Sequence, residues 1–126
     1  MQQILIVGIG GFIGAILRYM IGGWAQQGHG IFPVGTMTVN IAGSFFLGLV
    51  MGITEVREVF SVETRIFLTI GVLGAFTTMS AFSYDSFKLL EQKELLYFVV
   101  NVVGTVALTL FAVYMGRAAA PLLGRA

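Results

Sequence analysis

Four long stretches almost free of charged residues dominate this sequence of 126 residues. From Met1 to Thr54 the single formal charge is Arg18, and further uncharged runs cover 66–84 and 95–116. The polar connector 26–30 and Pro33 divide the first run into two segments. About 20 apolar residues in a helix span the hydrocarbon core of a bilayer. The sequence therefore predicts an all-α membrane protein of one domain, 1–126, with four transmembrane helices at approximately 3–25, 33–54, 62–88 and 95–116.

Composition supports this fold class and limits the possible partners. With 57% hydrophobic and 10% charged residues, the chain is too apolar for a soluble domain of its size. The first segment lacks a basic leading region and a small-residue cleavage site, so we interpret it as a retained helix rather than a signal peptide. The absence of cysteine excludes thiol chemistry, and a net charge of +1 without a basic patch predicts no nucleic-acid partner.

The basic residues are almost evenly divided between the two sides of the membrane. Four helices place Arg57, Arg65, Arg117 and Arg125 on one side, and Arg18, Lys88 and Lys93 on the other. Because the lysine and arginine bias sets orientation, such a chain could insert both ways up. A single, weakly preferred orientation is the alternative.

The third uncharged run has a polar second half, 74–83, which contains four hydroxyl side chains. Hydroxyl-rich, easily broken backbone at membrane depth is tolerated where it is buried in protein or lines a water-filled path. Gly71 and Gly74 precede the Thr77–Thr78 pair, so we expect this helix to be broken near the membrane centre. Carbonyls freed by the break could bind a cation. This segment predicts a pore.

Two other helices carry polar stripes with a four-residue spacing, which places each stripe on one helix face. They are Thr36, Asn40 and Ser44 in the second helix and Asn101, Thr105 and Thr109 in the fourth. Such stripes are costly in hydrocarbon unless they face each other or water. One interpretation is a polar track for a permeant species. The other is interhelical hydrogen bonding, worth about 0.6 kcal/mol for each bond.

The predicted spans lack the acidic residues that a proton-coupled transporter needs. We find no acidic residue inside a span, which leaves a proton relay without a candidate. A permeant anion would have to be bound by uncharged donors, with the electropositive ring edge of Phe82 as a further contact. Arg18 either extends to the interface or gives a vestibule a positive potential. The sequence shows no nucleophile–base pair and no metal cluster, so it does not predict an enzyme.

Seventeen glycines in so short a membrane protein indicate close helix packing. Gly10 with Gly14, and Gly48 with Gly52, form pairs at the spacing typical of tight helix contacts. Most of them could serve packing within one chain. Four thin helices, however, cannot easily surround a hydrated path, so we also expect an oligomer, most simply a dimer.

Three segments, 10–18, 35–40 and 74–83, resemble in order the motifs of the small fluoride channels of the Fluc (CrcB) family, and the resemblance covers nearly the whole chain. It implies an antiparallel, dual-topology homodimer in the cell inner (plasma) membrane, with two fluoride pores. It also implies a structural sodium ion at the dimer centre, bound by the backbone carbonyls of Gly74 and Thr77. The implied pore positions are Asn40, Met79, Ser80, Phe82, Ser83, Asn101 and Thr105, and Arg18 corresponds to a vestibule arginine.

Two positions depart from the family pattern, which reads Thr-Thr-Phe-Ser-Thr-Phe-Ser. Met79 stands in the third place, where the pattern has its first phenylalanine, and Ala81 in the fifth, where the pattern has its third threonine. Methionine has no electropositive ring edge, but its flexible thioether can fill a similar volume. We expect conduction to survive with Met79 lining the path. The alternatives are a proton-coupled small multidrug exporter, disfavoured because the first helix has no glutamate, and a non-conducting packing subunit.

Overall fold

The computed structural model describes residues 1–123, so Arg125 lies outside the described residues. These residues form four helical spans long and apolar enough to cross a membrane. Three are α1 (Gln2–Gln26), α2 (Val34–Arg57) and α6 (Leu95–Leu123). The third span is composite: α3 (Val62–Arg65), η1 (Ile66–Leu73), α4 (Gly74–Phe76) and α5 (Met79–Glu91). The prediction of an all-α, multi-pass membrane protein is confirmed.

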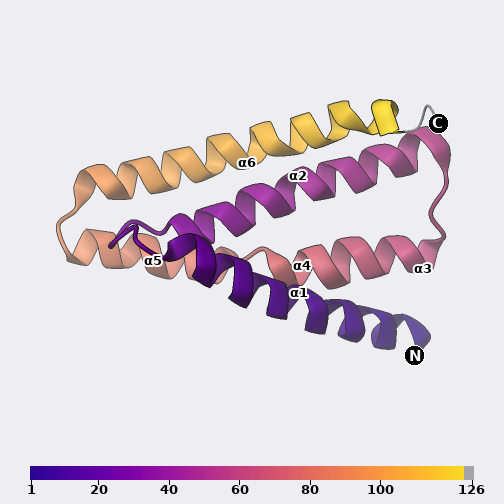
Figure 1. Ribbon diagram of the computed structural model, residues 1–126, viewed down its shortest axis with the longest axis horizontal. Coiled ribbons are helices and arrows are strands. Elements are labelled where there is room, and N and C mark those ends of the chain that lie inside the picture. The colour runs from indigo at the N-terminus through magenta and orange to yellow at the C-terminus, as the bar shows by residue number, and fades with distance from the viewer. Residues whose placement is uncertain (124–126) are drawn as a thin grey trace.

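The N-terminus, the connection between α2 and α3 and the last turns of α6 lie at one end of the bundle, and the other two connections lie at the opposite end (Figure 1). Helices α2 and α6 run side by side along most of their length, while α1 crosses the composite span. Helices α2 and α6 are also longer than predicted, because the prediction ended each helix near its charged residues. Glu55 and Arg117 instead form an ion pair beyond those predicted ends.

Glycines bring the helices into backbone contact. A Cβ atom on Gly116 of α6 would overlap the carbonyl oxygen of Phe45, and one on Gly48 of α2 would overlap that of Val113. On α1, a Cβ on Gly10 would lie 2.8 Å from the carbonyl oxygen of Phe67 in η1. The predicted close packing at these glycines is confirmed, and its physical basis is dispersion contact between backbones that carry no intervening side chain.

The third span is broken at Thr77 and Thr78, where the backbone becomes extended (φ −86° and ψ 157°, then φ −150° and ψ 119°). A break in this part of the span was predicted, and the extended residues are the two threonines rather than the glycines before them. Gly71 and Gly74 remain helical, and the α-carbon of Gly71 packs against Gly10 of α1. Glycine is thus used for close packing here, while hydroxyl side chains stabilise the extended residues. The Thr78 hydroxyl accepts from the Ala81 N–H as the N-cap of α5.

Candidate functional site

Asn40 of α2 binds the extended residue Thr78 through both ends of its carboxamide. Its Nδ2 donates to the Thr78 carbonyl at 3.1 Å, and its Oδ1 accepts from the Thr78 N–H at 2.8 Å. Asn40 is buried, and polar backbone groups at this depth need such partners because water does not supply them. The asparagine therefore takes the place of the helical hydrogen bonds that Thr78 has lost. The second hydrogen on Nδ2 remains available to a ligand.

The break also frees main-chain carbonyls at the end of α4. The last backbone hydrogen bond of this half runs from the Thr77 N–H to the Leu73 carbonyl. The Ala75 carbonyl accepts from Arg18 Nε at 3.0 Å. Within residues 1–123, the carbonyls of Gly74 and Thr77 accept no hydrogen bond. The site thus contains unpaired carbonyl oxygens whose lone pairs could bind a cation.

A cavity of about 340 Å³ lies beside the break. Six of the residues predicted for the pore or the sodium site line it: Asn40, Gly74, Thr77, Met79, Phe82 and Thr105. None of the lining side chains is charged. The cavity wall therefore offers amide, hydroxyl, carbonyl, thioether and aromatic groups, which can replace the hydration shell of a small ion without a fixed charge.

Three other predicted pore residues lie outside this cavity. Ser80 and Ser83 are exposed on α5. Asn101 is 1% exposed and donates from Nδ2 to the Ser86 hydroxyl at 2.9 Å. The Ser86 hydroxyl in turn donates to the Phe82 carbonyl at 2.7 Å. The Asn101–Ser86 bond joins α6 to α5 and favours the interhelical interpretation of the polar stripe at Asn101.

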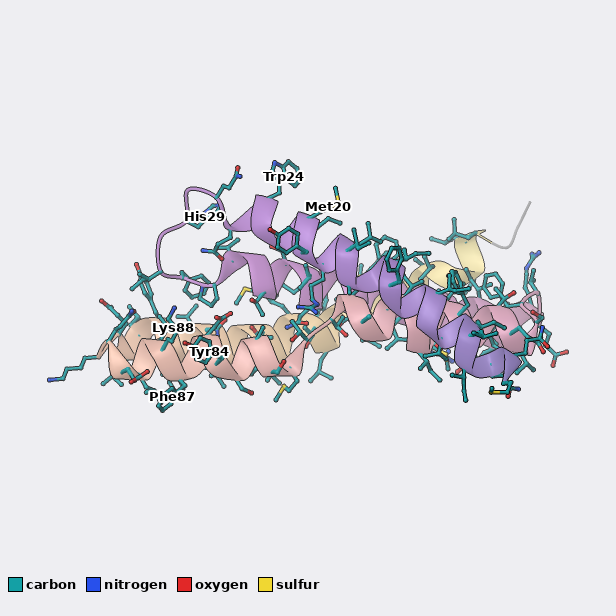
Figure 2. All side chains as sticks on the ribbon, turned by 90° about the horizontal axis from the view of Figure 1, so that it is seen from below. Met20, Trp24, His29, Tyr84, Phe87 and Lys88 are labelled. Carbon is teal, nitrogen blue, oxygen red and sulfur yellow. The ribbon has the colours of Figure 1, made fainter. Side chains whose placement is uncertain are left out.

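A second cavity, of about 950 Å³, lies between the last turns of α1, the start of α2 and α5. Arg18, Asp85 and Lys88 contribute charged groups to its wall. Figure 2 shows Lys88 on the side of α5 that faces the connection between α1 and α2, whereas Phe87 points the opposite way. The two cavities share Thr78 as a lining residue, so a wide, charged space adjoins a narrow, uncharged one.

Asp85 corrects the expectation that no span contains an acidic residue. It lies within α5, is half-buried, and its Oδ2 accepts from the Thr36 hydroxyl at 2.8 Å. The expectation considered only the uncharged run 66–84, although the predicted helix, 62–88, already contained Asp85, and the observed helix continues to Glu91. A carboxylate is tolerated here because it faces the wide cavity and has a hydroxyl donor. In the sequence, the polar side chain of Thr36 at the start of the α2 stripe was the one sign that this helix end needed a polar partner.

Gln26 is a second polar residue whose role was not predicted. Its Oε1 accepts from the Gly35 N–H at 2.9 Å, and its Nε2 donates to the carbonyls of Gly30 and Phe32. It therefore fixes the connection between α1 and α2 at the rim of the wide cavity. His29 of the same connection is exposed, and Figure 2 shows it at this end of the molecule.

Comparisons with known proteins agree with the site. A protein-family model described as "CrcB-like protein, Camphor Resistance (CrcB)" matches residues 5–117. "Fluoride-specific ion channel FluC 1" of Methanosarcina acetivorans is 58% identical over 120 residues, covering 95% of this chain and 92% of that one. "Fluoride-specific ion channel FluC" of Methanococcus aeolicus is 46% identical over 117 residues, covering 93% and 94%.

A similar protein from Shewanella halifaxensis, also named "Fluoride-specific ion channel FluC", is 44% identical over 118 residues, covering 93% of this chain and 94% of that one. The four spans together with these relatives indicate a multi-pass protein of a bacterial or archaeal plasma membrane. Because the family match extends over most of the sequence, this chain belongs to the CrcB family.

Proposed function

We propose that this chain is a fluoride-selective channel that conducts the ion passively out of the cytoplasm. The observation that carries the proposal is the uncharged cavity beside Asn40 and Phe82, which adjoins the wide, charged cavity at Thr78. The relatives named as fluoride-specific channels support it. The proton-coupled exporter is not favoured, because α1 contains no glutamate within Gln2–Gln26.

The cavity wall suggests how a strongly hydrated anion could pass. In the wide cavity, Arg18 and Lys88 would raise the local concentration of anions. In the narrow cavity, the free Nδ2 hydrogen of Asn40, the Thr105 hydroxyl and the ring edge of Phe82 would replace water one molecule at a time. Larger halides would be excluded by the fit and by the contact geometry.

We further propose an antiparallel homodimer with two pores, the arrangement that the family resemblance implies. Two features support this arrangement. Ser80 and Ser83 are exposed on a membrane-spanning helix, where uncovered hydroxyls facing lipid are unfavourable. The basic residues are also nearly balanced between the two sides, which permits both orientations. A second copy over this face would cover α5 and enclose the narrow cavity.

The natural test is anion efflux from liposomes that contain the purified protein, measured with fluoride- and chloride-selective electrodes. We expect rapid fluoride efflux without chloride efflux, lost on Phe82→Ile. Folded, dimeric protein that releases no fluoride would overturn the channel proposal and favour the packing subunit. Equal release of chloride would contradict selectivity while leaving a pore.

The unpaired carbonyls of Gly74 and Thr77 suit a sodium ion at the centre of the proposed dimer, because sodium prefers oxygen ligands and the break leaves these carbonyls without donors. Replacing sodium with N-methylglucamine is then expected to lower the thermal unfolding temperature in detergent. An ion at 100 times its dissociation constant contributes about 2.7 kcal/mol of stability. Unfolding temperatures that are equal in the two salts would contradict the site.

Met79 is expected to contribute to the path in place of an aromatic residue. In the single chain its side chain is 72% exposed. It lines the narrow cavity, where the flexible, polarizable thioether can adjust its position to contact the ion. We expect Met79→Ala to reduce fluoride efflux several-fold and weaken apparent affinity, and Met79→Phe to retain conduction. Flux and affinity unchanged in Met79→Ala would refute a pore role for this residue.

A further inference from the structure

Arg18 contacts the break directly, in addition to lining the wide cavity. Its Nε lies 3.0 Å from the carbonyl oxygen of Ala75, which is 57 residues away in the sequence. The contact depends on how closely α1 approaches this part of the chain. A Cβ on Gly14, one turn before Arg18, would overlap the Val72 carbonyl and lie 3.1 Å from the Ala75 Cβ. The approach at Gly14 thus places the guanidinium at the end of α4.

The Ala75 carbonyl needs this donor because the break removes its helical partner. In a continuous helix it would accept from the N–H of Met79, but Thr77 and Thr78 are extended. An orphaned carbonyl at membrane depth is costly. A guanidinium suits the position for two reasons: hydrogen bonds from ionised donors are the stronger kind, and a positive charge is favourable at a helix C-terminus.

Two side chains from other helices satisfy three backbone polar groups of the break. Asn40 takes the N–H and the carbonyl of Thr78, and Arg18 takes the carbonyl of Ala75. The carbonyls of Gly74 and Thr77, on either side of Ala75, remain without donors among residues 1–123. Arg18 therefore supplies the one hydrogen bond that a carbonyl in 74–77 receives among the described residues.

We propose that Arg18 is a positioning residue: its Nε–H binds the Ala75 carbonyl and fixes the conformation of the helix break. The proposal rests on the channel function proposed above and gives Arg18 a role separate from attracting anions. Lysine at this position cannot make the same hydrogen bond. It keeps the charge, but its donors are on a terminal ammonium rather than at the Nε position of a planar guanidinium.

Hydrogen–deuterium exchange in lipid nanodiscs tests this role without depending on flux. The variants are Arg18→Lys, Arg18→Gln and, as a matched control, Lys88→Gln, which removes a positive charge from the same cavity but has no contact with the break. We expect both Arg18 variants to accelerate exchange in 74–82 by about tenfold, the usual effect of losing a hydrogen bond from a charged group. Lys88→Gln is expected to leave that exchange unchanged.

Exchange in 95–116 of α6 separates this effect from general unfolding, and it should stay the same in all variants. In liposomes, Arg18→Lys is expected to slow fluoride efflux several-fold although it keeps the charge, and Arg18→Gln, which also loses the charge, is expected to slow it further. If Arg18 acts only through its charge, Arg18→Lys will match the wild type in both measurements, and the proposal is overturned. Exchange that rises equally in 74–82 and 95–116 would also overturn it. Absence of efflux in the wild type would instead refute the channel function, while the exchange result still decides the role of Arg18.

Discussion

Asn40→Ala is expected to reduce fluoride efflux by at least about tenfold. The substitution removes two hydrogen bonds to the extended residue Thr78, each worth about 1 kcal/mol. It also leaves the N–H and carbonyl of Thr78 unpaired at membrane depth, where neither finds a ready substitute. The same change deletes the second Nδ2 hydrogen of a residue that lines the narrow cavity. Loss of the positioned backbone and loss of an anion donor therefore act in the same direction.

Two further substitutions separate the contributions of Asn40. Asn40→Asp preserves the acceptor for the Thr78 N–H but places a carboxylate oxygen against the Thr78 carbonyl and in front of a permeant anion. We expect it to abolish efflux. Thr38→Ala, on the same helix, serves as the control and should conduct normally. Efflux is measured with a fluoride electrode on dimeric protein, and Asn40→Ala flux within twofold of the wild type would contradict this account.

Gly116→Ala is expected to cause the largest loss of stability among single-methyl substitutions. The added Cβ would overlap the carbonyl oxygen of Phe45 and lie 2.8 Å from the backbone nitrogen of Leu49. Backbone atoms cannot rotate away as a side chain does, so α2 and α6 would have to separate along their main contact. We expect a cost of roughly 3 kcal/mol, at the upper end for overpacking.

Gly104→Ala is the matched control on the same helix. Its Cβ would meet only the terminal methyl of Met37, at 3.7 Å, which is an ordinary contact. Because alanine has the better helix propensity, this variant should be as stable as the wild type or slightly more so. Temperature-dependent size-exclusion chromatography in detergent compares the two. Equal unfolding temperatures would show that α2 and α6 do not depend on the approach at Gly116.

The number and approximate positions of the spans were predictable because hydrophobic length is a local property of the chain. The residues at which the helices end were less predictable. Arg117 ends the last uncharged run, yet α6 continues past it: Arg117 pairs with Glu55 of α2, and Ala120 packs against Gly52 of the same helix. A charge on an isolated stretch indicates the end of a span, whereas a charge with a partner on the neighbouring helix can lie within a longer one.

In the candidate site, too, some features were predictable from the sequence and others depend on packing. A break in the third span followed from the clustered hydroxyls of 74–83, but its position at Thr77 and Thr78 depends on Asn40, nearly 40 residues earlier. Asn101 looked equivalent to Asn40 in sequence, with hydroxyl residues at the same spacing. In the fold it is buried against Ser86, because α6 packs on α5 at that level.

Composition and periodicity are enough to show that this protein lies in a membrane, how many helices cross it and which residue types an ion could meet. Which polar group each side chain contacts could be known only from the folded chain. Arg18 binds the Ala75 carbonyl and Asp85 binds Thr36, pairings that arise from the approach of α1, α2 and the broken span. Hydrogen bonds act over about 3 Å, so the partner of a polar side chain is set by helix packing rather than by its neighbours in the chain.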